Sequence, residues 1–101
     1  MKKYIRRLQD AIRHLHGSEC RHIATVPVTE QSQGRIIWQG DVEMFDLRGH
    51  PQAKRCYAWS YMNDEKEEHF NVVLELPPVD SPRAAVRAAL VARAKNEGDE
   101  T

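Results

Sequence analysis

Apolar residues near the start of the chain recur at helical spacing. On a wheel of about 100° per residue they fall within an arc of about 120°. They are Tyr4, Ile5, Leu8, Ala11, Ile12 and Leu15. Basic residues share the opposite arc, and Gly17 stands where a left-handed residue commonly ends a helix. The pattern predicts an amphipathic helix over residues 2–16.

After Gly17 the pattern changes to the alternation of apolar and polar residues that is typical of strands. Pro27 cannot donate to a ladder, so it favours an edge position for the first strand. In the second strand Phe45 and Leu47 interrupt the alternation, which indicates a bulge or a change of facing near Met44. The predicted strands are 22–29, 35–47, 54–62 and 69–76.

A second helix is predicted at about residues 82–96. Ser81 is a natural N-cap, Pro82 suits the first helical position, and Gly98 lies beyond the end. Val86 and Leu90 lie toward the arginine side of this helix. Part of an apolar flank is therefore expected to contact the first helix or another chain.

The order helix, three or four antiparallel strands, helix predicts an α+β fold with both helices packed on one face of the sheet. A chain of 101 residues has room for one compact domain. We assign residues 1–98 to it and 99–101 to an acidic tail. The other sheet face would then be open, and the stripe Tyr57, Trp59, Tyr61 would be either a working surface or interior packing, which is its commoner role.

Composition limits the classes of function. The chain has 15 basic and 15 acidic residues, so its net charge points to neither nucleic acid nor membrane. No apolar run approaches the roughly 18 residues of a membrane helix. Cys20 and Cys56 form no disulfide framework. We expect a cytoplasmic protein with free thiols and no membrane partner.

The stretch 14–22 gathers the candidates for metal binding and catalysis. Its two helical histidines, His14 and His16, diverge by about 200°, whereas Cys20 and His22 share one face of a strand. His14, Cys20 and His22 are weak metal candidates because zinc sites repeat a paired spacing that is missing here. A catalytic cysteine would need a neighbouring base, and the chain offers only Cys20 with His22, or Cys56 with a distant histidine. We expect no metal, no cofactor and no enzyme; a cysteine-based enzyme or a metal-binding protein is the lesser alternative.

Two stretches carry a resemblance to a known family. SPRAAVRAAL at 81–90 and GSECRHIATV at 17–26 resemble, in their placement, parts of the double-stranded RNA-binding domain, whose core runs helix, three strands, helix. That family begins its last helix with a Ser-Lys-Lys-type stretch, where this chain has only Arg83 and Arg87. The resemblance does not by itself imply RNA binding, and binding of double-stranded RNA is an alternative function.

The sequence therefore leaves two kinds of binding open. A protein partner or a second copy would use the aromatic stripe and the flank of the second helix. Nucleic acid would use the basic first helix and the loop at 48–55. The zero net charge and the sparse basic cluster favour protein contact or self-association. The candidate binding surface comprises Tyr57, Trp59, Tyr61, Arg48, His50, Lys54, Arg55, Arg83 and Arg87.

Overall fold

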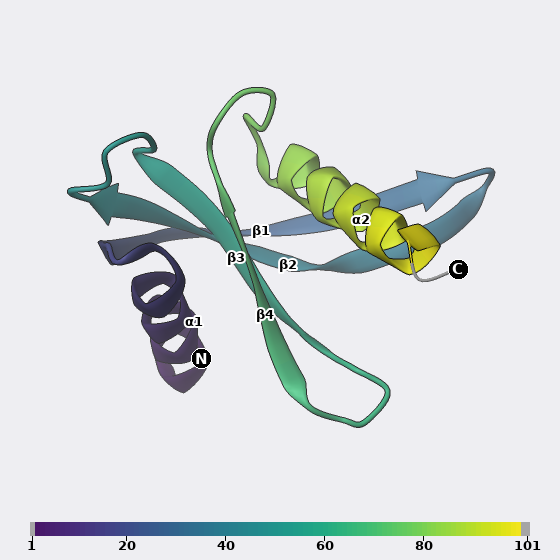
Figure 1. Ribbon diagram of the computed structural model, residues 1–101, viewed down its shortest axis with the longest axis horizontal. Coiled ribbons are helices and arrows are strands. Elements are labelled where there is room, and N and C mark those ends of the chain that lie inside the picture. The colour runs from purple at the N-terminus through teal and green to yellow at the C-terminus, as the bar shows by residue number, and fades with distance from the viewer. Residues whose placement is uncertain (1, 100–101) are drawn as a thin grey trace.

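The chain forms a helix, a four-stranded antiparallel sheet and a second helix, which confirms the predicted α+β class and element order. The computed structural model describes residues 2–99, with side chains from 3 to 94. Each strand pairs with the next one along the chain (Figure 1). The elements are α1 (Lys2–His16), β1 (Glu19–Ser32), β2 (Arg35–Arg48), β3 (Arg55–Met62), β4 (Glu68–Leu74) and α2 (Pro82–Asp99).

The local signals at the end of α1 and the start of α2 are confirmed. Gly17 has a positive φ of 66°, and its N–H donates to the carbonyl of Arg13 at 2.8 Å. At the start of α2, the Ser81 hydroxyl accepts the N–H of Ala84 at 3.1 Å, as an N-cap does. Helix α2 runs to Asp99, so it continues through Gly98, and the predicted end at about residue 96 with Gly98 beyond it is wrong. The rest of the predicted acidic tail lies outside the described residues.

The two helices cover opposite faces of the sheet, so the prediction that both pack on one face is wrong. Helix α1 packs Leu8 and Ile12 against Phe45, Cys56 and Ala58. Helix α2 instead packs Ala85 and Val86 against Val42, Tyr57 and Trp59. Successive strand residues point to opposite faces, so these β3 residues mark the two sides of the sheet. Figure 1 shows the helices on different sides of the crossing strands.

The alternation of β2 is not broken at Met44. Met44 packs with the α2 core, while Phe45 and Leu47 belong to the α1 core, as alternation requires. The irregularity near this point lies in β1, where the register shifts between His22 and Ala24. Apolar residues at neighbouring positions of β2 therefore indicate a strand covered on both faces.

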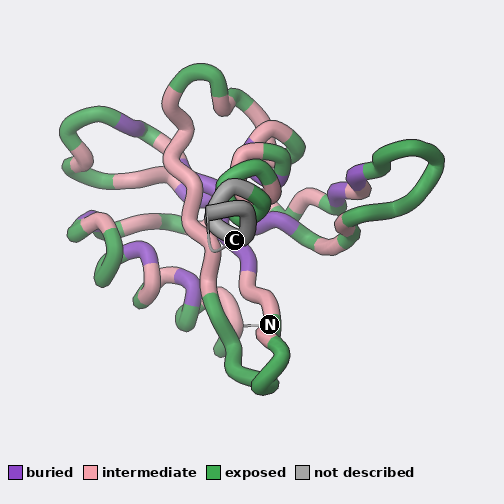
Figure 2. The backbone as a smooth tube through the Cα atoms, turned by 45° about the vertical axis from the view of Figure 1, so that its right-hand side comes forward, coloured by how far each residue is buried: buried purple, intermediate pink, exposed green. Residues whose placement is uncertain are grey.

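The predicted apolar flank of α2 is largely covered. Val86 is fully buried and Leu90 packs against the same core, whereas Val91 is 62% exposed. Figure 2 shows buried backbone where the strands cross and exposed backbone at the hairpin tips. Strand β1 lies at an edge of the sheet, as Pro27 predicted.

The sheet splits into two ribbons. Strands β2 and β3 pair only from Glu43↔Ala58 to Asp46↔Arg55. Beyond that short ladder, residues 35–42 of β2 continue with β1 alone, and residues 59–62 of β3 continue with β4 alone. The two ribbons diverge in Figure 1. An opening flanked by strand backbone follows from this divergence.

Replacing Phe45 with alanine should destabilise the protein. Phe45 is fully buried in the α1 core, and removing a buried phenyl ring typically costs about 3–5 kcal/mol. Urea denaturation followed by tryptophan fluorescence measures the loss. The control Val91→Ala should stay within about 0.5 kcal/mol of the parent, because that side chain is mostly exposed. Equal effects of the two variants would contradict the assignment of the core.

Candidate functional site

Three aromatic side chains gather at the opening between the ribbons. The rings of Trp38 on β2 and Trp59 on β3 meet edge to face, with centroids 5.7 Å apart. With Tyr61 they line a hollow of about 710 Å³ that α2 covers with Val86, Ala89 and Leu90 among other residues. A second hollow, of about 560 Å³, shares the same three aromatic residues and reaches Tyr4, Gly40, Asp41 and Ser60. The aromatic cluster Trp38, Trp59 and Tyr61 therefore stands between two concave regions.

The predicted aromatic stripe is mostly interior. Tyr57 is 1% exposed and Trp59 is 2% exposed, and both belong to the α2 core. The Tyr57 hydroxyl donates to the carboxylate of Glu75, and burial together with that carboxylate raises the pKa of Tyr57. Only Tyr61 is left partly open to a ligand.

Tyr61 is held by two neighbours. Its ring stacks on His69, with centroids 5.5 Å apart and planes 23° apart. The guanidinium of Arg93 lies 5.7 Å from the centre of the same ring, within the range of a cation–π contact. Through these contacts Tyr61, at the rim of the opening, packs against both β4 and α2.

Trp38 was not among the residues that the sequence singled out. Its signal in the sequence is Gly40, two positions further along the same strand and therefore on the same face. A Cβ on Gly40 would lie 3.1 Å from the Trp38 ring, so the missing side chain lets the indole lie against the strand. A large ring beside a glycine in one strand is a packing pair that composition alone does not reveal.

The side of the opening formed by β3 is partly closed by α1. The backbone N–H of Ser60 donates to the Tyr4 hydroxyl at 3.0 Å. Because residues 59–62 have no partner on β2, this side chain takes the place of a strand carbonyl. Tyr4 therefore links the N-terminal helix to the edge of β3.

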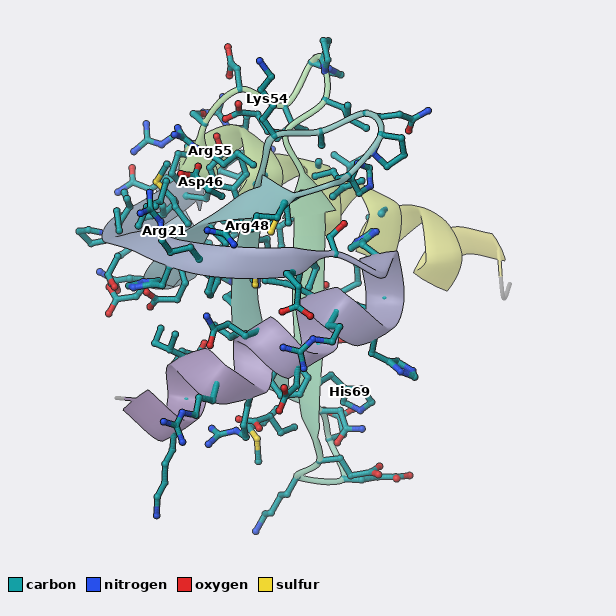
Figure 3. The ribbon with its side chains drawn as sticks, turned by 90° about the vertical axis from the view of Figure 1, so that its left-hand side faces the viewer. Arg21, Asp46, Arg48, Lys54, Arg55 and His69 are labelled. Carbon is teal, nitrogen blue, oxygen red and sulfur yellow. The ribbon has the colours of Figure 1, made fainter. Side chains whose placement is uncertain are left out.

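The loop at 48–55 and its neighbours form a basic cluster at another part of the molecule (Figure 3). Arg21 and Arg55 lie on either oxygen of the Asp46 carboxylate, at 3.6 and 3.3 Å. Arg48 and Lys54 are exposed and take part in no ion pair among the side chains that the structure describes. The structure thus brings together Arg48, Lys54 and Arg55 as the sequence suggested.

The loop is held next to the end of α1 by two histidines. The rings of His16 and His50 meet at 6.2 Å, nearly perpendicular. The Nδ1 atom of His50 accepts the backbone N–H groups of Gln52 and Ala53 at 3.1 and 2.9 Å. Burial, and to a lesser extent the charge of His50, lower the pKa of His16.

Arg83 and Arg87 do not join the basic cluster. They lie on α2 and face the Glu30 carboxylate of β1, at 3.3 and 3.0 Å. The Glu30 side chain is only 7% exposed, and Arg83 also donates to the carbonyl of Thr29 at 3.4 Å. The Oε1 atom of Glu30 lies within ion-pair distance of Arg83 but accepts no well-oriented hydrogen bond. These contacts attach α2 to the edge strand.

The weak metal candidates are separated or already engaged. His22 Nε2 lies 2.8 Å from a buried oxygen of Glu43, which also accepts the Thr25 hydroxyl. His14 is exposed on α1, and Cys20 packs against the α1 core. Within the part of the chain that the structure describes, no three His, Cys, Asp or Glu side chains converge in a way that could hold a metal ion.

Glu43 is a buried carboxylate on the same side of β2 as Phe45. That face is covered by α1, so Glu43 becomes interior and depends on its two polar neighbours. A buried carboxylate without partners would cost several kcal/mol. His22 and Thr25 therefore connect the bulged part of β1 to this carboxylate of β2.

The two cysteines are poor nucleophiles in this environment. Burial raises the pKa of the Cys56 thiol to about 12 and also raises that of Cys20. Both thiols are free. A raised pKa lowers the fraction of reactive thiolate at neutral pH.

A thiol reagent should distinguish the folded from the unfolded chain. In the Cys20→Ser variant at about pH 8, we expect Cys56 to react with Ellman's reagent only after denaturation, because its thiolate is suppressed by burial. The release of thionitrobenzoate measures the rate. A Cys56 reaction in the native protein as fast as that of free cysteine would contradict the structure.

Acid should weaken the fold through His16. Its folded-state pKa lies below the ordinary value of 6.5, so the unfolded chain binds the proton more readily. The free energy of unfolding should therefore fall as the pH drops through about 6.5 and below it. Urea titrations across this range measure the slope. The variant His16→Asn, which does not titrate, should show a shallower dependence, and an unchanged slope would rule out this contribution.

Comparisons with known proteins place the chain in no family. No family model matches it, and no match is found among curated proteins or solved structures. The resemblance to the double-stranded RNA-binding domain rests on the order of elements, and the chain has four strands instead of three, with helices on both faces. Among residues 2–99, no helix has both the length and the apolar character needed to cross a bilayer.

Proposed function

We propose that the chain is a non-catalytic binding module that acts by self-association. The observation that carries the proposal is the separation of β2 from β3 after four residue pairs. It leaves strand backbone beside hollows lined by aromatic rings. Unpaired strand edges accept a further strand, and aromatic hollows accept apolar side chains.

Exposed apolar residues near the opening support the proposal. Ile36 and Ile37 near the tip of β2 are 56% and 51% exposed, and Met62 at the end of β3 is 61% exposed. Apolar contact between copies would remove such side chains from water. The zero net charge of the chain also means that no long-range repulsion opposes the approach of two copies.

Binding of nucleic acid is the second candidate. It is favoured by the basic cluster, in which Arg48 and Lys54 are exposed beside the end of α1. Arg55, Arg83 and Arg87 face carboxylates of the same chain, so they would have to exchange these partners for phosphates.

The raised pKa of both thiols supports a role without cysteine catalysis. A cytoplasmic location stays a prediction from the sequence.

Sedimentation velocity over a range of protein concentrations tests the proposal. We expect concentration-dependent dimers at about 50 mM salt that persist at about 500 mM, because apolar and backbone contacts are weakly screened. A chain that stays monomeric at the highest concentrations would overturn the proposal. Retention of a double-stranded RNA oligomer by such a monomer, lost as salt rises, would establish the second candidate instead.

A further inference from the structure

We propose that two copies of the chain pair antiparallel through the open edge of β2, about a two-fold axis at Gln39. This inference rests on the proposed self-association and names the surface and the register that produce it. The edge in question is residues 35–42, which have a partner on the β1 side only.

The other strand edges each carry a proline or a side chain that meets the backbone, whereas residues 35–42 contain no proline and none of their outward backbone groups is capped by a described side chain. The outer edge of β1 contains Pro27, which has no N–H to donate. The open edge of β3 has its Ser60 amide bound to Tyr4. The outer edge of β4 is met by His16, whose ring lies near the backbone of Val72. Uncapped edges are the ones that recruit another strand.

The direction of the backbone groups on β2 follows from the short ladder. The N–H of Leu47 donates to the carbonyl of Lys54 at 2.8 Å, so odd-numbered residues of this part of β2 face β3. Because neighbouring residues direct these groups to alternate sides, Gln39 and Asp41 present their N–H and C=O groups to the opening. The hollow of about 560 Å³ lies beside the same residues.

A free antiparallel edge is complementary to a two-fold copy of itself, since each outward N–H meets the outward C=O of the same residue in the other chain. An axis at Gln39 gives two such hydrogen bonds at the centre. It also sets Trp38 opposite Gly40 of the second copy. Each Gly40 is already covered by the Trp38 ring of its own chain, so this register brings the two indoles side by side across the axis.

The register with its axis one residue earlier fits less well. An axis at Trp38 would set one indole directly against the other. Ile37 is the extra residue of β2 at the register shift, because Trp38 pairs with Glu30 and Ile36 pairs with Gln31. With the axis at Gln39 and Ile37 skipped, Asp41 lies opposite Ile36 of the second copy. No like charges then face each other, which would be unfavourable in a ladder. The half-exposed Ile36 gains a neighbour at the same time.

Disulfide trapping tests the register with a matched control. In Gln39→Cys, the two new thiols would face each other across the axis, at a separation of about 5.5 Å between Cα atoms, which suits a disulfide. Oxidation by air in the presence of copper phenanthroline should give a covalent dimer at least tenfold faster than in Gln31→Cys. Gln31 is an exposed glutamine on the other strand of the same ribbon, opposite Ile36.

Proline variants supply the second measurement. Gln39→Pro removes an N–H that points into the opening and should raise the dimer dissociation constant at least tenfold in sedimentation velocity. Gln31→Pro removes an outward N–H on the edge of β1 that already contains Pro27, and should leave the constant unchanged. Circular dichroism checks that both variants keep the fold.

The outcomes separate the two proposals. Dimers of the parent chain that neither Gln39→Cys traps nor Gln39→Pro weakens would overturn the β2 register and leave self-association standing. A parent chain that never dimerises would overturn both. Faster trapping of Gln39→Cys with loss of dimers in Gln39→Pro would support both.

Discussion

The alternation of small and large residues along β3 is the constraint on which this fold depends. Cys56 and Ala58 face α1, and their small side chains let Leu8 and Ile12 approach the sheet. Tyr57 and Trp59 face α2, where Ala85 and the short side chain of Val86 leave room for two rings. One strand therefore anchors both cores. On the opposite face α1 would place Leu8 and Ile12 against large rings, and α2 would place its small side chains against small ones and leave a gap.

The divergence of the ribbons is consistent with the same constraint. The only ladder between β2 and β3 lies where both cores meet, at Glu43↔Ala58 to Asp46↔Arg55. Beyond it, the edge-to-face contact of Trp38 and Trp59 stands between the strands and occupies space that close pairing would require. Strand twist adds to the separation, because each ribbon of two strands twists more strongly than a wide sheet. Tyr4 of α1 then binds the β3 side of the opening, and α2 covers the aromatic rings on the other face.

The elements could be predicted from the sequence because their signals are local. Helix periodicity, Gly17 and Ser81 predicted the end of α1 and the start of α2, and Pro27 predicted the edge strand. The end of α2 was predicted too early, because a helix can continue through a glycine such as Gly98. The face that each helix covers depends on which strand side chains are apolar on each side of the sheet. We assumed that only one face is covered, so the neighbouring apolar residues Met44 and Phe45 were interpreted as a bulge instead of as a strand buried on both faces. The candidate site could not be predicted because it is built on a contact between Trp38 and Trp59, which are far apart in the sequence and are brought together only by the fold. The partners of Arg83 and Arg87 were equally hidden, because Glu30 lies on another element and is buried only after folding.

The open edge of β2 lies beside a covered core, so its backbone groups are not used for the stability of the single chain and are available for association. Pairing residues 35–42 of β2 with β3 would satisfy more backbone groups within one chain, yet it would require Trp38 and Trp59 to give up their contact. The fold keeps the aromatic contact and leaves the polar groups of Gln39 and Asp41 to water or to another strand. In water these groups lose little, since solvent satisfies them. A second copy would therefore gain mainly by covering Ile36 and ordering a short ladder, which favours a weak dimer that forms and separates readily.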